Sequence, residues 1–380
     1  AALIRGRRPL RILAPSSPDT RLSNPASSDG RTRMYAVRAN DILLSRFRVR
    51  GSIGFGNSGT VVRAEDQITG TAVAVKILHR DEDLHGDVEL EERVYKKLVA
   101  GCNPSISLFA RVLGSGSHRG FHCIVFELCH GTLYDVMQGY SALLPLPARH
   151  LVEIGYQLVK AVEYLHSMKL VHTDIKLDNI ALRCHDTVRV RWLDPLTGFH
   201  EKKMLVSAQI CLIDLGGVIE LQGRGLSYGR IGTRGYRAPE VALAGIPWTS
   251  GVDSFAIGCV LAELYLSHNL FDPTIEDDRE YLVATERLLG PFPREYAVAI
   301  ESKYAGTFKI EDSVYVQFPP AHSVMLASDY AESLRRLEAI KPLAAQVHDG
   351  DLCNLVGHLM ALNPAERISM EEAARHKFFD

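Results

Sequence analysis

Residues 172–179, His-Thr-Asp-Ile-Lys-Leu-Asp-Asn, gather several chemically active side chains in one short stretch. Asp174 is followed by Lys176 two positions later and by Asn179 five positions later. Forty residues after Asp174, Asp214 opens an Asp-Leu-Gly sequence that directly follows an apolar run. Transfer of a phosphoryl group needs a carboxylate at the acceptor hydroxyl, a cation beside the moving phosphate and oxygen ligands for magnesium. The spacing therefore indicates phosphoryl-transfer chemistry rather than a chance group of polar residues in a loop.

Each of these side chains suits one part of that reaction. Asp174 would accept or orient the proton of the attacking hydroxyl, and Lys176 would stabilise charge on the transferring group. Asn179 and Asp214 would supply oxygen ligands for Mg²⁺. We expect His172 to pack and form hydrogen bonds within the loop rather than to act as a base.

Residues 54–61, Gly-Phe-Gly-Asn-Ser-Gly-Thr-Val, contain a G-x-G-x-x-G pattern that different kinds of nucleotide site share. A dinucleotide-binding turn should open a helix and be followed by an acidic residue about twenty positions later. Here a strand-like sequence follows, and position 76 is Lys. A Walker loop would need a Gly-Lys-Ser/Thr sequence, which does not follow. The pattern therefore predicts a glycine-rich hairpin whose backbone N–H groups approach phosphate oxygens.

Lys76 lies in the apolar sequence Val-Ala-Val-Lys, where an unpaired ammonium would be costly. It therefore needs phosphates and a carboxylate partner. Glu91 precedes apolar residues by four and seven positions, which places it on the inward stripe of a helix. Glu91 is the predicted partner of Lys76, with Glu89 and Glu92 as alternatives.

The order of strand-like and helix-like segments predicts an α+β fold with two lobes. A small β-rich lobe with one helix, at about 87–99, should cover 41–126, and a larger helical lobe should cover about 130–380. A chain of 380 residues is also longer than one hydrophobic core normally serves. Strands are expected at 47–50, 60–63, 72–77 and 121–126, and helices at 148–167, 251–266, 280–289, 330–340 and 352–362.

Charge is distributed unevenly along the chain. Residues 1–40 contain eight Arg, no Lys and two Asp, whereas the whole chain has a net charge of −2. This Arg-, Ser- and Pro-rich segment is expected to be a flexible extension, as a linker or, alternatively, a targeting or nucleic-acid-binding arm. The seven Cys include no C-x-x-C pair, so zinc-site spacing is absent and a reducing compartment is favoured. No apolar stretch is long enough to predict a membrane span.

The motifs together resemble those of eukaryotic protein kinases, in full order across about 41–380. The matching sequences are Gly-x-Gly-x-x-Gly, Val-Ala-Val-Lys, His-Thr-Asp, Asp-Leu-Gly and Ala-Pro-Glu at 238–240. The resemblance implies a bilobal kinase fold that uses ATP and Mg²⁺. It implies catalytic roles for Lys76, Glu91, Asp174, Lys176 and Asn179, and metal binding by Asn179 and Asp214. The implied ATP-binding residues are Ile53, Gly54, Phe55, Gly56, Asn57, Ser58, Gly59, Thr60, Val61, Ala74, Lys76, Phe126, Glu127 and Leu128, the last three at the hinge.

Three further positions are expected to be structural. Glu240, at the end of the Ala-Pro-Glu motif, should be a buried carboxylate, and Arg367 is its expected fork-shaped partner. Asp253, at the start of an apolar helix, should cap that helix or anchor the catalytic loop. Leu215 replaces the usual Phe of the kinase motif and should remain an apolar plug behind Asp214.

Finer features resemble the LAMMER, or Cdc2-like, kinases of the CMGC group. Thr173 occupies the position where most kinases have Arg, and residues 280–287, Glu-Tyr-Leu-Val-Ala-Thr-Glu-Arg, resemble the E-H-L-A-M-M-E-R of that family. An insert at about 184–208, with a hairpin over 188–198, also fits. Leu177-Asp178 replaces the family's Pro-Glu, and Asp-Leu-Gly is more like the sister SR-protein kinases, which are the nearest alternative.

The LAMMER resemblance implies a Ser/Thr kinase of arginine-serine-rich splicing factors that also autophosphorylates on Tyr. Such a kinase regulates mRNA splicing in the nucleus, with the cytoplasm as a second compartment. Protein substrates are then expected, with no membrane, no direct nucleic-acid binding, and a monomer by default. The acidic residues Glu276, Asp277 and Asp278, with Asp272 and Glu280, are a candidate docking patch for basic substrates or, alternatively, a solvated loop. Since Thr173 has no charge to pair with a phosphate, we predict activity without phosphorylation of the activation segment.

Two rival functions from other classes were compared with the kinase hypothesis. A pseudokinase scaffold would bind nucleotide or partners without turnover, but every catalytic position identified above is filled. An RNA-binding protein would act through its arginine-rich head, but the chain lacks the interleaved aromatic and basic residues of RNA-recognition motifs.

Overall fold

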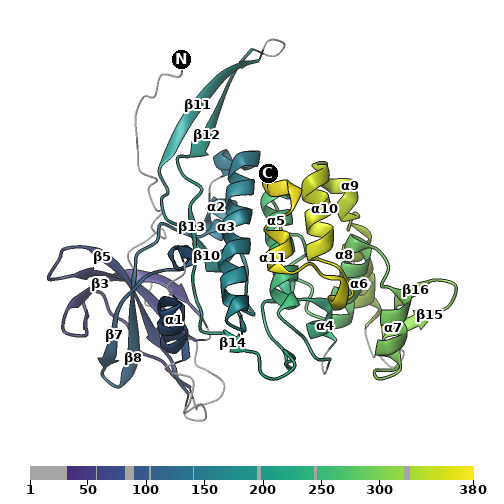
Figure 1. The fold of residues 1–380 in the computed structure, drawn as a ribbon, viewed down its shortest axis with the longest axis horizontal. Helices are drawn as coiled ribbons and strands as arrows, with labels where there is room; N and C mark the ends of the chain where they lie inside the picture. Colours follow the sequence, from purple (N-terminus) through teal and green to yellow (C-terminus); the bar gives the residue numbers. More distant parts are fainter. Residues whose placement is uncertain are drawn as a thin grey trace. The chain divides into compact units, whose positions relative to one another are not determined.

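The computed structural model describes residues 32–56, 58–81, 90–101, 104–139, 141–194, 198–243, 246–320 and 326–380. These residues divide into two compact units (Figure 1). Unit 1 contains residues up to 131 together with 181–218, and unit 2 contains 132–180 and 219–380. A β-rich unit and a helical unit confirm the expected α+β architecture.

The division differs from the simple boundary expected near residue 130, because residues 181–218 join the β-rich unit. Ala110 N–H donates to the carbonyl oxygen of Leu212 at 3.1 Å. Arg183 donates to Glu127 at 2.8 Å and to the carbonyl of Phe109 at 3.0 Å. These contacts bind the segment to residues far away in the sequence, which sequence order alone does not indicate.

The centre of unit 1 is a six-stranded antiparallel sheet with strand order β2-β3-β4-β5-β8-β7. Alternating residues of its strands, such as Val49, Val62 and Val75, are buried in one apolar cluster. All four predicted strands are confirmed, and β2 and β7 add to them. The bounds are β2 Ile42–Leu43, β3 Phe47–Phe55, β4 Gly59–Asp66, β5 Ala72–Leu78, β7 Val112–His118 and β8 Phe121–Glu127.

The remaining elements of unit 1 are one helix and short strand pairs. The helix α1 spans Leu90–Ala100, so the predicted start at 87–89 lies outside the described residues. The expected insert forms a long hairpin of β11 (Thr187–Asp194) and β12 (Gly198–Leu205), which Figure 1 shows as two paired arrows. The other pairs are β1 (Thr32–Arg33) with β6 (Arg80–Asp81), and β10 (Ile180–Leu182) with β13 (Ile210–Leu212).

Part of the expected flexible extension belongs to unit 1. Strand β1 pairs with β6, and Tyr35 is buried against the apolar cluster of the sheet. The folded unit therefore includes residues before the boundary expected at 41, while residues 1–31 lie outside the described residues.

Unit 2 consists mainly of helices, with the strand pairs β9–β14 and β15–β16. Helices α3 and α5 have the predicted bounds, and α6, α8 and α10 begin two or three residues earlier than predicted. The bounds are α2 Leu133–Gly139, α3 Ala148–Ser167, α4 Pro239–Ala242, α5 Gly251–Leu266, α6 Asp278–Leu289, α7 Arg294–Glu301, α8 Ala327–Glu338, α9 Leu343–Gln346, α10 Gly350–Leu359 and α11 Met370–Ala373, with β9 Leu170–Val171, β14 Ile219–Glu220, β15 Phe308–Ile310 and β16 Val314–Val316.

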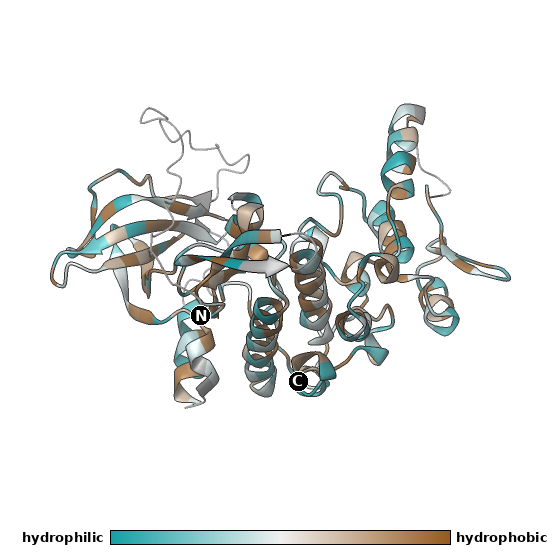
Figure 2. Cartoon of the chain, turned by 90° about the horizontal axis from the view of Figure 1, so that it is seen from above, coloured by the Kyte–Doolittle hydropathy of each residue, from teal (hydrophilic) through white to brown (hydrophobic). Residues whose placement is uncertain are grey.

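The core of unit 2 surrounds α5, whose residues from Val252 to Leu264 are all buried. A helix that is apolar on every side must lie inside a fold, and α3 and α10 pack against α5. The outer elements carry both hydrophilic and hydrophobic residues (Figure 2). Among the residues described, none of the helices combines the length and the apolar character that crossing a membrane would need.

Candidate active site

The catalytic loop lies in unit 2 between β9 and the 3₁₀ turn Leu177–Asn179. Asp253, a buried residue of α5, accepts backbone hydrogen bonds from His172 at 2.8 Å and from Thr173 at 2.9 Å. Its carboxylate also contacts His166 Nε2 at 2.9 Å. The expected anchoring role of Asp253 is therefore confirmed, because one buried carboxylate fixes the backbone immediately before Asp174.

Thr173 shows that this backbone is held in an unfavourable conformation. Its φ is 71°, in the left-handed region that a β-branched residue rarely adopts. Such a conformation costs about 1–3 kcal/mol and persists only where surrounding contacts impose it. The two bonds to Asp253 supply that constraint.

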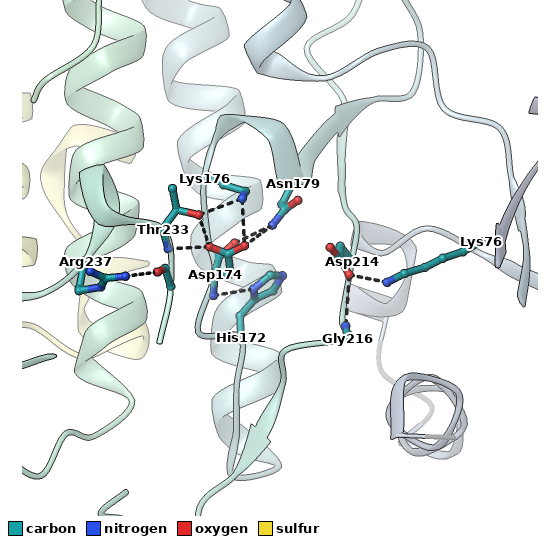
Figure 3. Close-up of polar contacts among 10 residues, drawn as sticks. Lys76, His172, Asp174, Lys176, Asn179, Asp214, Gly216, Thr233 and Arg237 are labelled. Carbon is teal, nitrogen blue, oxygen red and sulfur yellow. Dashed lines mark hydrogen bonds and ion pairs between the residues drawn. The ribbon is translucent and has the colours of Figure 1, made fainter. Parts of the chain in front are cut away.

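Asp174 is the centre of a polar cluster (Figure 3). Its Oδ1 accepts hydrogen bonds from Thr233 N at 2.9 Å and from Thr233 Oγ1 at 2.7 Å. Its Oδ2 lies 3.1 Å from Lys176 Nζ and 3.2 Å from Asn179 Nδ2. Lys176 Nζ also donates to Thr233 Oγ1 at 2.9 Å. The three residues predicted from the catalytic loop are thus brought together, and Thr233 joins them.

The role of Thr233 was not predicted, although it lies in the Gly-Thr-Arg-Gly-Tyr-Arg-Ala-Pro-Glu sequence before Glu240. It is 59 residues from Asp174 in the chain. The available signal was a hydroxyl residue next to a kinase-like motif, but sequence spacing does not show which side chain it contacts.

His172 is buried and its Nδ1 accepts a hydrogen bond from Asp174 N–H at 3.3 Å. This position within the loop confirms that His172 supports the backbone. Asn179 is also buried, and its amide nitrogen donates to the Asp174 carbonyl oxygen at 2.8 Å. Since the nitrogen is turned toward Asp174, the amide oxygen is the atom of Asn179 that could bind a cation.

In unit 1, Lys76 is held between two carboxylates. Its Nζ lies 2.6 Å from Glu91 Oε2 and 2.6 Å from Asp214 Oδ1 (Figure 3 shows the Asp214 contact). Lys76 and Glu91 are 4% and 2% exposed, so both charges are removed from water. Burial would lower the pKa of Lys76, but the two carboxylates outweigh it and raise this pKa, which keeps the ammonium charged.

Glu91 reaches Lys76 because of its place on α1. It shares a buried face with Val94, Tyr95 and Leu98, the stripe on which the prediction was based. Burial raises the pKa of the Glu91 carboxyl, and the nearby Lys76 ammonium opposes that shift. The predicted partner is therefore confirmed over its alternatives among the described residues, whereas Glu89 lies outside them.

The Asp-Leu-Gly sequence follows β13, and each of its three residues has a different structural role. Asp214 has a φ of 60°, which turns its carboxylate toward Lys76. Leu215 is completely buried, as expected for an apolar plug. A Cβ atom on Gly216 would lie 3.2 Å from Lys76 Nζ and 3.3 Å from Asp214 Oδ1, so a side chain there would crowd the ion pair.

The glycine-rich sequence forms the hairpin between β3 and β4, as predicted. Phe55 pairs with Thr60, and Gly56 N–H donates to the Gly59 carbonyl at 3.0 Å. A Cβ atom on Gly59 would lie only 2.6 Å from the Ile77 carbonyl oxygen, so this position requires glycine. Ile53 and Phe55 are 51% and 60% exposed, which leaves apolar surface at the tip of the sheet. Asn57 lies outside the described residues.

The predicted hinge residues lie where β8 ends. Phe126 is buried and pairs with Ala74 of β5. Glu127 N–H donates to the Arg111 carbonyl at 2.9 Å, and its side chain accepts from Arg183 at 2.8 Å. Any backbone contact between Glu127 and an adenine edge is therefore restricted to its carbonyl oxygen.

Glu240 and Arg367 form the predicted buried pair of unit 2. Both side chains are fully buried, and the two guanidinium nitrogens lie 2.7 Å and 3.1 Å from the carboxylate oxygens. Arg367 also donates to the carbonyls of Gly251 and Ala361. The pair joins the end of the segment that carries Thr233 to the start of α5.

Comparisons with known proteins agree with this geometry. The family model described as "Protein kinase domain" matches residues 47–379. A crystal structure of a kinase domain has the same fold, with a TM-score of 0.78 and 23% identity, and the match covers 91% of this chain and 99% of the other.

Three relatives give a finer placement. Dual specificity protein kinase CLK1 of Mus musculus is 32% identical over 345 residues, 90% of this chain and 68% of the relative. Dual specificity protein kinase lkh1 of Schizosaccharomyces pombe is 29% identical, over 97% of this chain but 52% of its own length. Serine/threonine-protein kinase AFC3 of Arabidopsis thaliana is 29% identical, over 94% and 88%. The chain, which spans about half of the yeast relative, belongs to the protein kinase family and within it resembles the LAMMER, CLK-type dual-specificity kinases.

Proposed function

We propose that this chain transfers the γ-phosphate of ATP to Ser and Thr hydroxyls of arginine-serine-rich proteins, and to Tyr of its own chain. The observation that carries the proposal is the cluster of Lys176, Asn179 and Thr233 around the Asp174 carboxylate. Such a group of a base, a cation and an amide is what phosphoryl transfer requires. The names of the relatives, dual specificity and serine/threonine kinases, support the choice of acceptor.

Asp174 would orient the acceptor hydroxyl and take up its proton, while the neighbouring Lys176 ammonium would stabilise charge on the transferring phosphoryl group. The side chain of Asp174 is 30% exposed, so a substrate hydroxyl can reach it. Thr233 Oγ1 fixes the orientation of both Asp174 and Lys176, since it donates to one and accepts from the other.

Members of the protein kinase family use ATP and Mg²⁺. The donor atoms here fit that ion, because Mg²⁺ prefers oxygen, and Asp214 supplies a carboxylate and Asn179 an amide oxygen. Among the described residues, no group of three or more acidic, His or Cys side chains could hold a metal alone. Mg²⁺ commonly completes its shell with phosphate oxygens and water, so each of these two side chains would need to supply only one oxygen to a nucleotide-bound ion. When bound, it would neutralise phosphate charge, and the Lys76 ammonium would contact phosphate oxygens.

A preference for basic substrates is supported by acidic residues beside the catalytic loop. Asp178 and Asp135 are both exposed, and Asp135 lies in the first turn of α2, which packs against the Leu177–Asn179 turn. Partial desolvation raises the pKa of Asp178, the Lys176 ammonium opposes that shift, and the negative charges of Asp135 and Asp174 add to it. A substrate guanidinium placed between these carboxylates would relieve that repulsion.

The acidic stretch at 276–280 is a weaker candidate for docking than the sequence indicated. Asp277 caps α6 by accepting from Glu280 N–H at 2.8 Å, and Glu280 is buried against Arg336 at 2.9 Å. Asp278 is bound by arginines of the same unit. Most of these charges are therefore used inside the protein.

The proposal is tested by radiolabel transfer from Mg-ATP to an arginine-serine repeat peptide and to a proline-directed peptide, with Asp174→Ala as the inactive control. Transfer of label to the arginine-serine peptide by the wild type, without transfer by Asp174→Ala, would support the proposed substrate class. Label only on the proline-directed peptide would keep a CMGC kinase but reject arginine-serine substrates. Absence of transfer, together with retained ATP binding, would favour the pseudokinase scaffold.

The role of the acidic pair needs its own measurement. Asp178→Asn and Asp135→Asn should each raise KM for the arginine-serine peptide several-fold and leave KM for ATP unchanged. Asp312→Asn, which removes an exposed carboxylate elsewhere on the same unit and outside the acidic stretch at 276–280, is the matched control. Equal KM values for the basic peptide in all three variants would refute selection by Asp178 and Asp135.

We further propose that the protein acts as a monomer, mainly in the nucleus and also in the cytoplasm, and that it does not bind nucleic acid directly. The substrate class supports the nuclear location, because splicing factors work there. Imaging of a tagged full-length protein and a binding assay with labelled RNA would test these points.

A further inference from the structure

Three arginines of the segment that carries Thr233 surround one carboxylate. Arg230 Nη2 lies 2.7 Å and 2.8 Å from the two oxygens of Asp278, the first residue of α6. Arg234 Nη1 lies 2.5 Å from Asp278 Oδ1, and Arg237 Nη1 lies 3.8 Å from the same atom. The Asp278 carboxylate therefore lies close to three guanidinium groups from residues up to seven positions apart in the chain.

The charges in this cluster do not balance. The side chain of Arg237 is 9% exposed, and within the described part of the chain its buried Nη1 has no hydrogen-bond partner. Burial lowers the pKa of Arg237, and the positive charges of Arg230 and Arg234 lower it further, whereas Asp278 opposes the shift. Without Asp278, the three like charges would face one another and would push this segment apart.

The same segment positions the catalytic carboxylate. Arg237 donates to the carbonyls of Ile231 at 2.9 Å and Gly232 at 2.7 Å, the two residues before Thr233. Gly232 has a φ of 68° and lies so close to the Thr173 carbonyl that a Cβ atom would be 2.7 Å from its oxygen. Thr233 then binds Asp174 through its backbone and its hydroxyl. A shift of the arginines would therefore move Thr233 away from Asp174.

We infer that Asp278 is a positioning residue for catalysis: a built-in carboxylate that holds Arg230 and Arg234, and with them Thr233 against Asp174. It supplies from within the chain the negative charge that a phosphate group could otherwise bring to such an arginine cluster. This inference rests on the proposed kinase function and names how its active geometry is held. It also gives a structural reason for the predicted activity without phosphorylation of the activation segment, alongside the uncharged Thr173.

The first test replaces the charge without changing the shape. Asp278→Asn should lower kcat by about 10- to 100-fold, because small displacements of positioned groups cost about that much. KM for ATP should stay unchanged, and Asp278→Glu should recover part of kcat. Asp277→Asn is the matched control: it removes a neighbouring charge at the same helix end, and Asn caps helices as well as Asp does. A kcat within twofold of wild type in Asp278→Asn, or an equal loss in Asp277→Asn, would overturn the inference.

The second test measures the geometry without using activity. Hydrogen exchange of a peptide that contains Thr233 should be faster in Asp278→Asn than in wild type, because its amide would lose Asp174 Oδ1 as acceptor. Unchanged exchange would refute the positioning role. This readout also separates the two proposals, since a wild-type protein that phosphorylates no peptide would refute the kinase function and still allow the exchange comparison.

The third test asks whether negative charge is the property that matters. In Asp278→Ala, added inorganic phosphate or sulfate should restore part of kcat, whereas chloride at the same ionic strength should not. Wild-type kcat should not change after phosphatase treatment. If neither anion restores activity and Asp278→Glu remains as slow as Asp278→Asn, the charge is not the cause and the inference fails. Melting curves of each variant confirm that it is folded before kinetics are compared.

Discussion

Replacement of Glu240 by Gln should strongly destabilise unit 2. The substitution keeps the volume of the side chain but removes the charge opposite Arg367 and turns one acceptor into a donor facing it. Arg367 would remain fully buried, held by the carbonyls of Gly251 and Ala361 and stacked 5.4 Å from the ring centre of Phe255. Those neutral contacts cannot replace a carboxylate as counter-charge.

The magnitude follows from the burial of the pair. Removal of one partner from a buried, hydrogen-bonded ion pair costs about 3–5 kcal/mol, because the other charge stays desolvated and unpaired. Domains have free energies of unfolding of only about 5–15 kcal/mol, so this is a large fraction. With a urea dependence of about 2–3 kcal/mol per molar, the unfolding midpoint of unit 2 should fall by about 1–2.5 M.

The chain provides its own probe and its own control. Trp248 is buried in unit 2, and Trp192→Phe would make it the only tryptophan, so its fluorescence reports unfolding of that unit. Glu371→Gln removes a carboxylate from another Arg–Glu pair, with Arg375, in which both side chains are more than 60% exposed. That control should cost no more than about 0.5 kcal/mol. If Glu240→Gln costs less than about 1 kcal/mol, burial does not determine the strength of these pairs and the reasoning is wrong.

Further predictions follow from the buried groups. Burial raises the pKa of Cys123 to about 11, so iodoacetamide at pH 8 should leave this thiol unmodified in the native protein. Mass spectrometry that finds alkylated Cys123 would contradict this prediction. Burial also raises the pKa of the Glu263 carboxyl, so the folded state keeps this proton at a pH where the unfolded state has lost it. Unit 2 should therefore lose stability as the pH rises above about 4.3 toward that raised pKa. Urea titrations at several pH values should show this loss in the wild type and a smaller dependence of stability on pH in Glu263→Gln. Lys76→Met should lower kcat and weaken nucleotide binding, since Glu91 and Asp214 would lose the cation between them; unchanged affinity for fluorescent ATP would contradict the role of Lys76.

The sequence alone determined the chemistry of this protein and much of its fold. Asp174, Lys176 and Asn179 lie within six positions, so one short loop carries all three side chains. Glu91 could be chosen because helical periodicity decides which residues share a face. Helices α3 and α5 were predicted with their observed bounds, because α3 has a clear helical periodicity and α5 is a long apolar run.

Only the tertiary structure decided which distant side chains meet. Thr233 contacts Asp174 across 59 positions, and Asp278 contacts Arg234 across 44. Residues 181–218 join unit 1 through contacts with Phe109 and Ala110, which precede their partners by about 70–100 positions. Helical and strand periods relate residues a few positions apart, whereas these pairings depend on how separate elements pack. For that reason the acidic stretch at 276–280 could be predicted as a charged surface but not as a helix cap, a buried ion pair and a carboxylate that holds arginines.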